Sequence, residues 1–341
     1  MRPAWDDVNA RARGLSTHLL TRSELDALAR VPDITALAAG LRRCGVLGGT
    51  AEEVPTPGRL ELSIRRWAGA QLRLLARWLG PRSAVLPLVF AAEDRRSLRA
   101  IFRGIAERAP AEQRLAGLIP TPALPERALE ALAAAPTAAA AAALLAVWRH
   151  PLAAAAAWTG AADPDLFALD ASLARTSAEQ DRRAAHRTHD AALRNAVRES
   201  IDLDNALTAV VLATGGRDVA PASQFLSGGA QVSSVAFREA IATGDASAAG
   251  ARLAEALTGS VYAELFARGA GDPAALESAV LRLRLRELAR RVRRAPLGPL
   301  ALIWFALRLR AQVLDLHRII WTVALDAPRA ALVGALVTAE R

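Results

Sequence analysis

The chain has 341 residues and a mass of 36.0 kDa, which is enough for two or three domains with cores of their own. Its net charge is +9 and its sequence pI is near 11.2, a balance that suits nucleic acid, an anionic membrane surface or an acidic protein partner. The single cysteine, Cys44, excludes an intramolecular disulfide framework and a multi-cysteine metal site, so we expect a reducing cytoplasm.

The composition predicts an all-α protein. Alanine runs at residues 138–143 and 153–157, abundant Leu and Arg, and an aromatic content of 4% are typical of helix-forming sequences. Alternating Val, Ile and Thr stretches of strand length are almost absent. All 43 basic residues are Arg, which we attribute to a GC-rich genome rather than to selection for guanidinium chemistry.

The first predicted unit covers residues 1–112, and its N-terminus lacks the apolar core of a signal peptide. Thr21 or Ser23 can cap a helix that has Glu24 in its first turn. Further helices are expected over residues 34–41, 60–79 and 86–105.

The second predicted unit covers residues 113–222. It opens on the sequence IPTPALPER, whose prolines predict a rigid turn followed by a helix with Pro near its first position. Two helices centred on the alanine tracts follow. A polar helix is expected over residues 176–198, where His186 and His189 would lie three residues apart.

The third predicted unit covers residues 223–341. Ser227, Gly228 and Gly229 predict a turn, and a basic helix is expected over residues 276–294. The apolar stretches at residues 131–148 and 295–307 are interpreted as buried helices rather than membrane spans, because one is mostly Ala and the other is too short.

A similar phrase occurs once in each unit: DRRSLRAIF from Asp94, DLDNALTAVV from Asp202 and LDLHRIIW from Leu314. With Arg99, Leu207 and Arg318 taken as equivalent, the spacings are 108 and 111 residues. A second set of matching phrases begins upstream, at Leu19, Leu118 and Phe225. A period of this size is that of a domain, so the pattern predicts one helical domain built three times. The repeat motif residues are Asp94, Arg99, Asp202, Asn205, Asp315 and Arg318.

The acidic residues of these phrases have two interpretations. In one, Asp94, Asp202, Asp204 and Asp315 make ion pairs between helices, with Arg99, Arg318 or neighbouring residues, and fix the register of the repeat. In the other, they line a shared axial site where the three units meet. The sequence favours the ion pairs and leaves the axial site open.

No pattern indicates catalysis. His186 and His189 could face one side of a helix, but no HExxH pattern accompanies them, so a solvated polar face is favoured over a metal site. The Ser227 turn lacks the pattern of a phosphate-binding loop. The arginine-rich helix 282–294 is a solvated face or a contact for an anionic partner. We therefore expect no enzyme activity, no cofactor and no metal.

Several stretches, in order along nearly the whole chain, resemble the C-type subunit of the V/A-type rotary ATPases, the prokaryotic counterpart of the d-type subunit of the eukaryotic V-ATPase. They are VNARARG with LLTRSELDAL, EDRRSLRAIFRGIA, LIPTPAL, FLSGGAQVSSVAFREAIATGD and PLALIWFALRLRAQVLDLHRIIW. Each motif alone is weak, and their order and spacing carry the resemblance.

The resemblance implies three similar helical domains arranged as a funnel around a pseudo-threefold axis. It implies a non-catalytic socket in the central stalk that joins the shaft, made of D-type and F-type subunits, to the membrane proteolipid ring during proton or sodium transport. It also implies a peripheral position at the cytoplasmic face of the membrane, with no nucleic acid bound. The rival hypothesis is a basic all-helical nucleic-acid-binding or regulatory adaptor protein, which predicts salt-dependent binding to DNA or RNA.

Overall fold

The computed structural model describes residues 5–48, 55–157, 165–215 and 221–338, and every regular element among these residues is a helix. The predicted all-α fold class is therefore confirmed. The chain divides into two compact units: unit 1 comprises Met1–Trp148 with Leu285–Arg341, and unit 2 comprises Arg149–Arg284. The division into three units of about 110 residues stays a prediction.

Unit 1 contains most of the helices and both chain ends. Its helices are α1 (Asp6–Ser16), α2 (Arg22–Ala29), α3 (Ile34–Arg43), α4 (Pro57–Leu79), the 3-10 helix η1 (Gly80–Val85), α5 (Leu86–Ala106), α6 (Ala111–Arg114), α7 (Glu126–Ala133), α8 (Ala138–Val147), the second half of α16 (Pro273–Arg294), α17 (Leu300–Ala324) and α18 (Arg329–Ala335).

Side-chain caps fix where α2 and α3 begin. Of the two predicted cap residues, Thr21 caps α2 and forms a capping box, since its side chain accepts from the Glu24 N–H while the Glu24 carboxylate accepts from the Thr21 N–H. Asp33 caps α3 through the Ala36 N–H at 2.8 Å. The long predicted helices of this unit are confirmed as α4 and α5.

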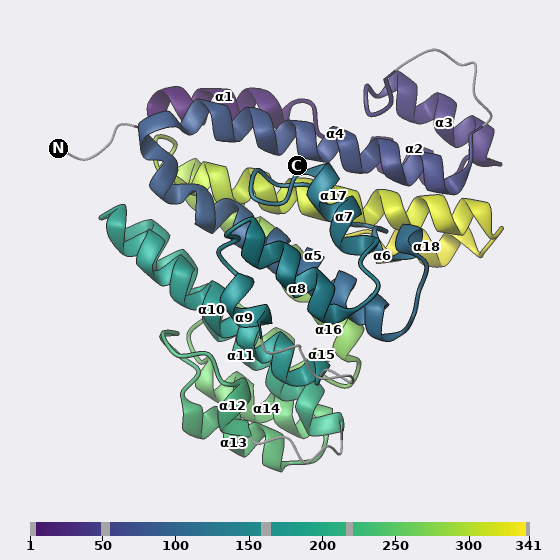
Figure 1. The fold of residues 1–341 in the computed structure, drawn as a ribbon. Coiled ribbons are helices and arrows are strands. Elements are labelled where there is room, and N and C mark those ends of the chain that lie inside the picture. Colours follow the sequence, from purple (N-terminus) through teal and green to yellow (C-terminus); the bar gives the residue numbers. More distant parts are fainter. Residues whose placement is uncertain (1–4, 49–54, 158–164, 216–220, 339–341) are drawn as a thin grey trace. The chain divides into compact units, whose positions relative to one another are not determined.

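The core of unit 1 is built around α17, which packs against α1, α2, α3, α4 and α5. Figure 1 shows α4 running beside α17. Phe305, Leu309 and Ile320 of α17 are fully buried, and burial of each such side chain is worth about 1.5–3 kcal/mol. Gly69 of α4 permits a close approach of the chain, because a Cβ there would lie 3.1 Å from the Cβ of Pro120.

Unit 2 contains α9 (Ala153–Ala156), α10 (Leu166–Arg187), α11 (Ala191–Thr214), α12 (Pro221–Gln224), α13 (Ser234–Ala242), α14 (Ala246–Ala256), α15 (Ala263–Gly269) and the first half of α16. Helix α11 packs against α10, α13 and α14, and α14 packs against α15. Phe237 and Phe266 are fully buried in this core. A Cβ at Gly250 would lie 2.5 Å from the Phe266 carbonyl oxygen, so α14 and α15 meet with backbone almost in contact.

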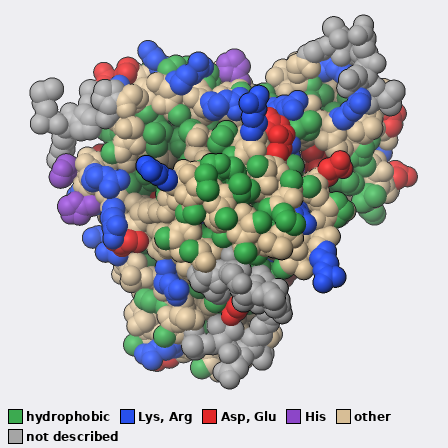
Figure 2. Space-filling model, viewed as in Figure 1, with side chains coloured by type: hydrophobic (Ala, Val, Ile, Leu, Met, Phe, Trp, Pro, Cys, Tyr) green, Lys and Arg blue, Asp and Glu red, His purple; other side chains and the backbone are tan. Residues whose placement is uncertain are grey.

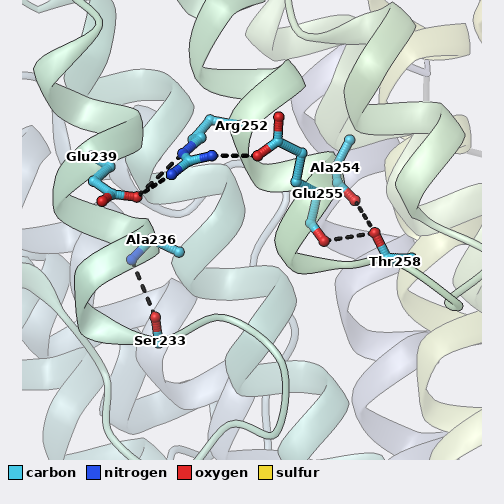
Figure 3. Close-up of polar contacts among 7 residues, drawn as sticks. All are labelled: Ser233, Ala236, Glu239, Arg252, Ala254, Glu255 and Thr258. Atoms are coloured by element: carbon cyan, nitrogen blue, oxygen red, sulfur yellow. Dashed lines mark hydrogen bonds and ion pairs between the residues drawn. The ribbon is translucent and has the colours of Figure 1, made fainter.

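Polar contacts tie α13 to α14 at the surface of unit 2 (Figure 3). The Arg252 guanidinium donates to Glu239 Oε2 at 2.7 Å and also pairs with Glu255 on its own helix. The hydrogen bond with Glu239, followed by the one with Glu255, raises the pKa of Arg252. These groups are exposed, so their contribution to stability is small.

One local prediction differs from the structure. The single polar helix expected over residues 176–198 is wrong, because α10 ends at Arg187 and α11 begins at Ala191. His189 lies between them with a φ of 53°, and Asp190 caps α11 through the Leu193 N–H at 3.0 Å. The proline predicted near the start of α7 is Pro125, which occupies the N-cap position directly before the first helical residue.

Candidate functional site

Asp202 and Asn205 of α11 bind the segment that leads into α13. The Asp202 carboxylate accepts hydrogen bonds from the backbone N–H groups of residues 230–232 at 2.8 to 3.1 Å. One turn further along the helix, Asn205 Oδ1 accepts from the Leu226 N–H at 2.8 Å, and its Nδ2 donates to the Leu226 carbonyl at 2.9 Å. Both side chains are buried. The lead-in segment, residues 225–232, is therefore fastened to α11 at two points.

These N–H groups follow directly after the Ser227 turn, whose sequence was compared above with a phosphate-binding loop. The turn is present at Ser227 and Gly228, and α13 begins shortly after it at Ser234. The N–H donors already bind the Asp202 carboxylate, so an anion from within the protein occupies them. The N–H groups after this turn therefore serve to hold the lead-in segment on α11.

In unit 1, Asp94 of α5 binds the corresponding lead-in segment, residues 118–124. The Thr121 hydroxyl donates to Asp94 Oδ1 at 2.5 Å and accepts from the Leu124 N–H at 3.0 Å. The Thr121 N–H in turn donates to the Leu124 carbonyl at 3.0 Å. Asp94 and Thr121 are both buried. A helix carboxylate again holds the turn that precedes a pair of short helices, here α7 and α8.

The third carboxylate, Asp315 of α17, binds the last described residues of the chain. Its oxygens accept from the N–H groups of Val337 at 2.7 Å and Thr338 at 2.8 Å. Burial raises the pKa of the Asp315 carboxyl above its usual value, and the hydrogen bonds from the two N–H groups oppose that effect. One turn earlier on α17, Gln312 Oε1 accepts from the N–H of Leu20, in the lead-in segment of α2, at 3.0 Å.

Arg22 connects the two segments that α17 holds. Its guanidinium donates to the carbonyls of Thr338 at 3.1 Å and Val333 at 2.5 Å, and it pairs with Asp26 at 2.9 Å. The C-terminal segment from α18 to Thr338 therefore lies bonded to both α17 and α2. This part of unit 1 joins elements about 300 residues apart in the sequence.

The predicted repeat residues thus act mainly on backbone. Asp94, Asp202 and Asp315 each hold a segment through N–H or hydroxyl donors, while the Arg318 guanidinium lies 4.0 Å from Asp315 and donates to the Ala335 carbonyl at 2.7 Å. Arg99 is exposed on α5. Whether the carboxylates also line a shared axial site stays a prediction.

Two residues of these contacts were not singled out from the sequence as partners: Gln312 and Thr121. Gln312 and Asn205 share one signal, since each is a buried amide three residues from a repeat Asp on an otherwise apolar helix face. Thr121 lies in the proline-rich phrase that already predicts a rigid turn. The lead-in segments are held by Asp94, Asp202, Asn205 and Gln312. The two amides, Asn205 and Gln312, each lie within one helical turn of a repeat Asp.

A second polar cluster joins α4 to the C-terminal half of α17. Glu61 Oε1 accepts from the Trp321 indole N–H at 2.7 Å, and His317 Nδ1 lies 2.5 Å from the same oxygen. Burial raises the pKa of Glu61, but the contacts with His317 and Trp321 and the charge of Arg65 together outweigh burial and hold that pKa below its usual 4.5. Glu61 is therefore a carboxylate that binds its neighbours as an anion.

The described residues offer no metal centre, since no group of three or more His, Cys, Asp or Glu side chains is placed to hold an ion. The His186 and His189 rings lie 6.3 Å apart at their centroids; His186 belongs to α10, and His189 lies in the break between α10 and α11. Within the same residues, no helix combines the length and apolar character needed to span a bilayer.

The sequence of the chain matches the family described as ATP synthase (C/AC39) subunit over residues 8–332. The chain belongs to this family. A search of curated proteins finds no match. As a C/AC39 subunit, the chain is an accessory subunit of a V/A-type rotary ATPase, and the resemblance drawn from its sequence motifs is confirmed.

Proposed function

We propose that this C/AC39 subunit is the socket of the central stalk, which receives the shaft of D-type and F-type subunits and seats it on the membrane proteolipid ring. It lies at the cytoplasmic face of the membrane and transmits torque without bond chemistry of its own. The family match over residues 8–332 carries the proposal. The proposal includes the funnel of three similar helical domains.

The hydrogen bonds of the long helices support a mechanical role. A coupling subunit has to resist twisting. The buried carboxylates of Asp202 and Asp94 each bind a turn to a long helix. Such charge-assisted bonds are about twice as strong as neutral ones. Their recurrence at residues 94, 202 and 315 also supports the threefold repetition.

The first test is purification of the tagged full-length chain from its native membranes in mild detergent, followed by mass spectrometry. The proposal expects the proteolipid ring, both shaft subunits and the catalytic subunits to accompany it. Recovery of DNA or RNA without ATPase subunits would support the basic adaptor instead. The genes beside that of the chain offer a quick check, since they should encode the remaining ATPase subunits.

A second test separates a rotor subunit from a stationary one. The catalytic head is fixed to a surface and a bead is attached through a cysteine placed at an exposed position such as Asn195, with Cys44 replaced by Ser. Addition of ATP should turn the bead. A bead that stays still while a bead on the shaft turns would contradict a place in the rotor.

A further inference from the structure

The net positive charge of the chain lies in one of its two units. Unit 1 holds 30 of the 43 arginines against 18 acidic residues, and unit 2 holds 13 against 16. The net charges are therefore +12 and −3, so unit 1 carries more than the whole excess. A charge of this size on about 200 residues attracts anions over a Debye length of about 8 Å.

Part of that charge gathers on one face of unit 1, formed by α1, α4 and the end of α16. Figure 2 shows basic side chains over α1 and α4. The face is made by six exposed arginines, Arg11, Arg13, Arg73, Arg77, Arg293 and Arg294, and is called the basic face below.

Contacts between the elements make this face continuous. The Arg11 guanidinium lies over the Trp78 ring, 5.5 Å from its centroid, which places α1 beside the arginines at the end of α4. The Arg13 guanidinium donates to the Pro296 carbonyl at 3.0 Å, which places the other edge of α1 beside the turn after Arg294. Helix α1 therefore bridges the arginines of α4 and those of α16.

Few acidic groups neutralise the basic face. Arg73, Arg77, Arg293 and Arg294 form no ion pair with any acidic residue that the structure describes. The acidic residues of α1 are Asp6 and Asp7 in its first turn, and Asp7 pairs with Arg82, which lowers its pKa to about 2.

An apolar side chain projects beside these charges. Leu297 follows Arg294 and Pro296 in the turn between α16 and α17, and it is 67% exposed. Its neighbours Gly298 and Pro296 are held to α1 by Asn9 at 2.9 Å and by Arg13, so the turn is fixed with Leu297 outward. Arginines that surround an exposed leucine are typical of surfaces that contact both lipid headgroups and the acyl chains just below them.

We propose that the basic face binds anionic lipid headgroups, with Leu297 inserted at the level of the acyl chains. This goes beyond the socket role, which concerns protein partners alone. The arginines come from three separate elements rather than from one cluster, an arrangement that matches a diffuse sheet of lipid phosphate. An acidic patch on another protein is the competing occupant, and the experiment separates the two.

The test uses the isolated full-length chain and sedimentation with vesicles of phosphatidylcholine alone or mixed with phosphatidylglycerol. The test variant carries four substitutions, Arg73→Gln, Arg77→Gln, Arg293→Gln and Arg294→Gln. The matched control removes four exposed arginines of unit 2: Arg187→Gln, Arg198→Gln, Arg238→Gln and Arg268→Gln. Circular dichroism and thermal unfolding show whether each variant keeps its fold.

The wild-type chain should sediment with the phosphatidylglycerol vesicles and not with neutral ones, and added salt should weaken this binding. Each basic side chain near an anionic surface accounts for about fivefold in binding, so the test variant should bind more than about a hundredfold more weakly. The control should bind like the wild type. Leu297→Ser should weaken binding at high salt, where the apolar contact remains.

Equal loss in the test and control variants would overturn the proposal, because net charge alone would then explain binding. Absence of binding to the anionic vesicles would overturn it as well. If the test variant loses ATPase subunits in detergent while its vesicle binding is unchanged, the face contacts an acidic protein and the lipid proposal is wrong. The socket role is tested separately by copurification and rotation, so either idea can fail alone.

Discussion

Gly229 and Asp202 lie so close that a Cβ on the glycine would be 2.2 Å from the aspartate Oδ1 and 2.9 Å from its Cγ. The absence of a side chain at residue 229 is what lets the carboxylate reach the three N–H groups that follow. The glycine is therefore needed for space. The charge pattern of the sequence gives no sign of this requirement for glycine at residue 229.

Replacement of this glycine should weaken unit 2. In Gly229→Ala the methyl group has to displace Asp202 from its donors, and we expect a loss of about 1–3 kcal/mol in the free energy of unfolding, measured in urea by circular dichroism. Gly14→Ala in α1 is the control, since its Cβ would meet nothing within 4 Å and should stabilise the helix by up to about 1 kcal/mol. A Gly229→Ala protein as stable as the wild type would show that the contact has room to relax.

Asp202→Asn should be destabilising although it changes the size of the side chain very little. An amide NH2 would replace one of the oxygens that face backbone N–H donors, which leaves buried donors without an acceptor. We expect a loss of about 2–4 kcal/mol. The exposed Glu277→Gln serves as the control for loss of one charge in unit 2.

The two substitutions act on one contact and should not add. In the double variant, Gly229→Ala with Asp202→Asn, the second change should cost less than it does alone, because the first has already disturbed the hydrogen bonds. Full additivity within about 0.5 kcal/mol would mean that glycine and aspartate stabilise unit 2 independently.

The sequence predicted the helices and the recurring acids better than it predicted their contacts. Capping at Thr21, the long helices and the all-α class follow from local patterns, which act within one turn. The partners of Asp202 and Asp315 are backbone N–H groups more than 20 residues away, and any residue type except proline supplies such a group. No side-chain pattern could have identified them.

The break between α10 and α11 was missed for a different reason. The sequence from Thr176 to Arg198 contains no Gly or Pro, so helix propensity alone continues through it. The structure ends α10 with His189 in the left-handed region and restarts with Asp190 as a cap, a signal present in the sequence but outweighed by its helix-forming neighbours. Tertiary packing of α10 on α11 decides the outcome.

Removal of the C-terminal segment should expose the role of Asp315. A chain that ends at Ala335 lacks Leu336 and Val337, which are buried, and loses both N–H donors to the carboxylate. We expect a loss of about 3–5 kcal/mol in unit 1, as for other buried charges deprived of their partners. Loss of apolar burial alone could reach a similar value, so the truncation needs a second substitution.

Asp315→Ala supplies that comparison, because its effect on the stability of unit 1 should have opposite signs in the full-length and the truncated chain. In the full-length chain it should destabilise unit 1, since two buried N–H groups lose their acceptor. In the truncated chain it should stabilise, since it removes a carboxylate whose ionisation burial already disfavours. Thermal unfolding of the full-length and truncated chains, each with and without Asp315→Ala, measures both effects. Destabilisation by Asp315→Ala in both chains would contradict the assigned contact.

Glu61 provides a test by pH. Its pKa is lower in the folded chain than the usual 4.5, so the unfolded chain binds the proton more readily and folding stability rises with pH between the two values. The contribution of Glu61 is complete above its unfolded pKa and is lost as the pH falls through the folded pKa. Glu61→Gln should therefore lower the melting temperature at neutral pH, and the difference from the wild type should shrink on acidification.

The exposed Glu130→Gln is the matched control and should show no comparable difference at any pH. Trp321→Phe removes one donor to Glu61 and keeps an aromatic ring, so it should reproduce part of the pH-dependent loss. The groups that face Glu61 are His317, Trp321 and Arg65. A Glu61→Gln difference that is constant from acid to neutral pH would assign the effect to packing rather than to the ionised carboxylate.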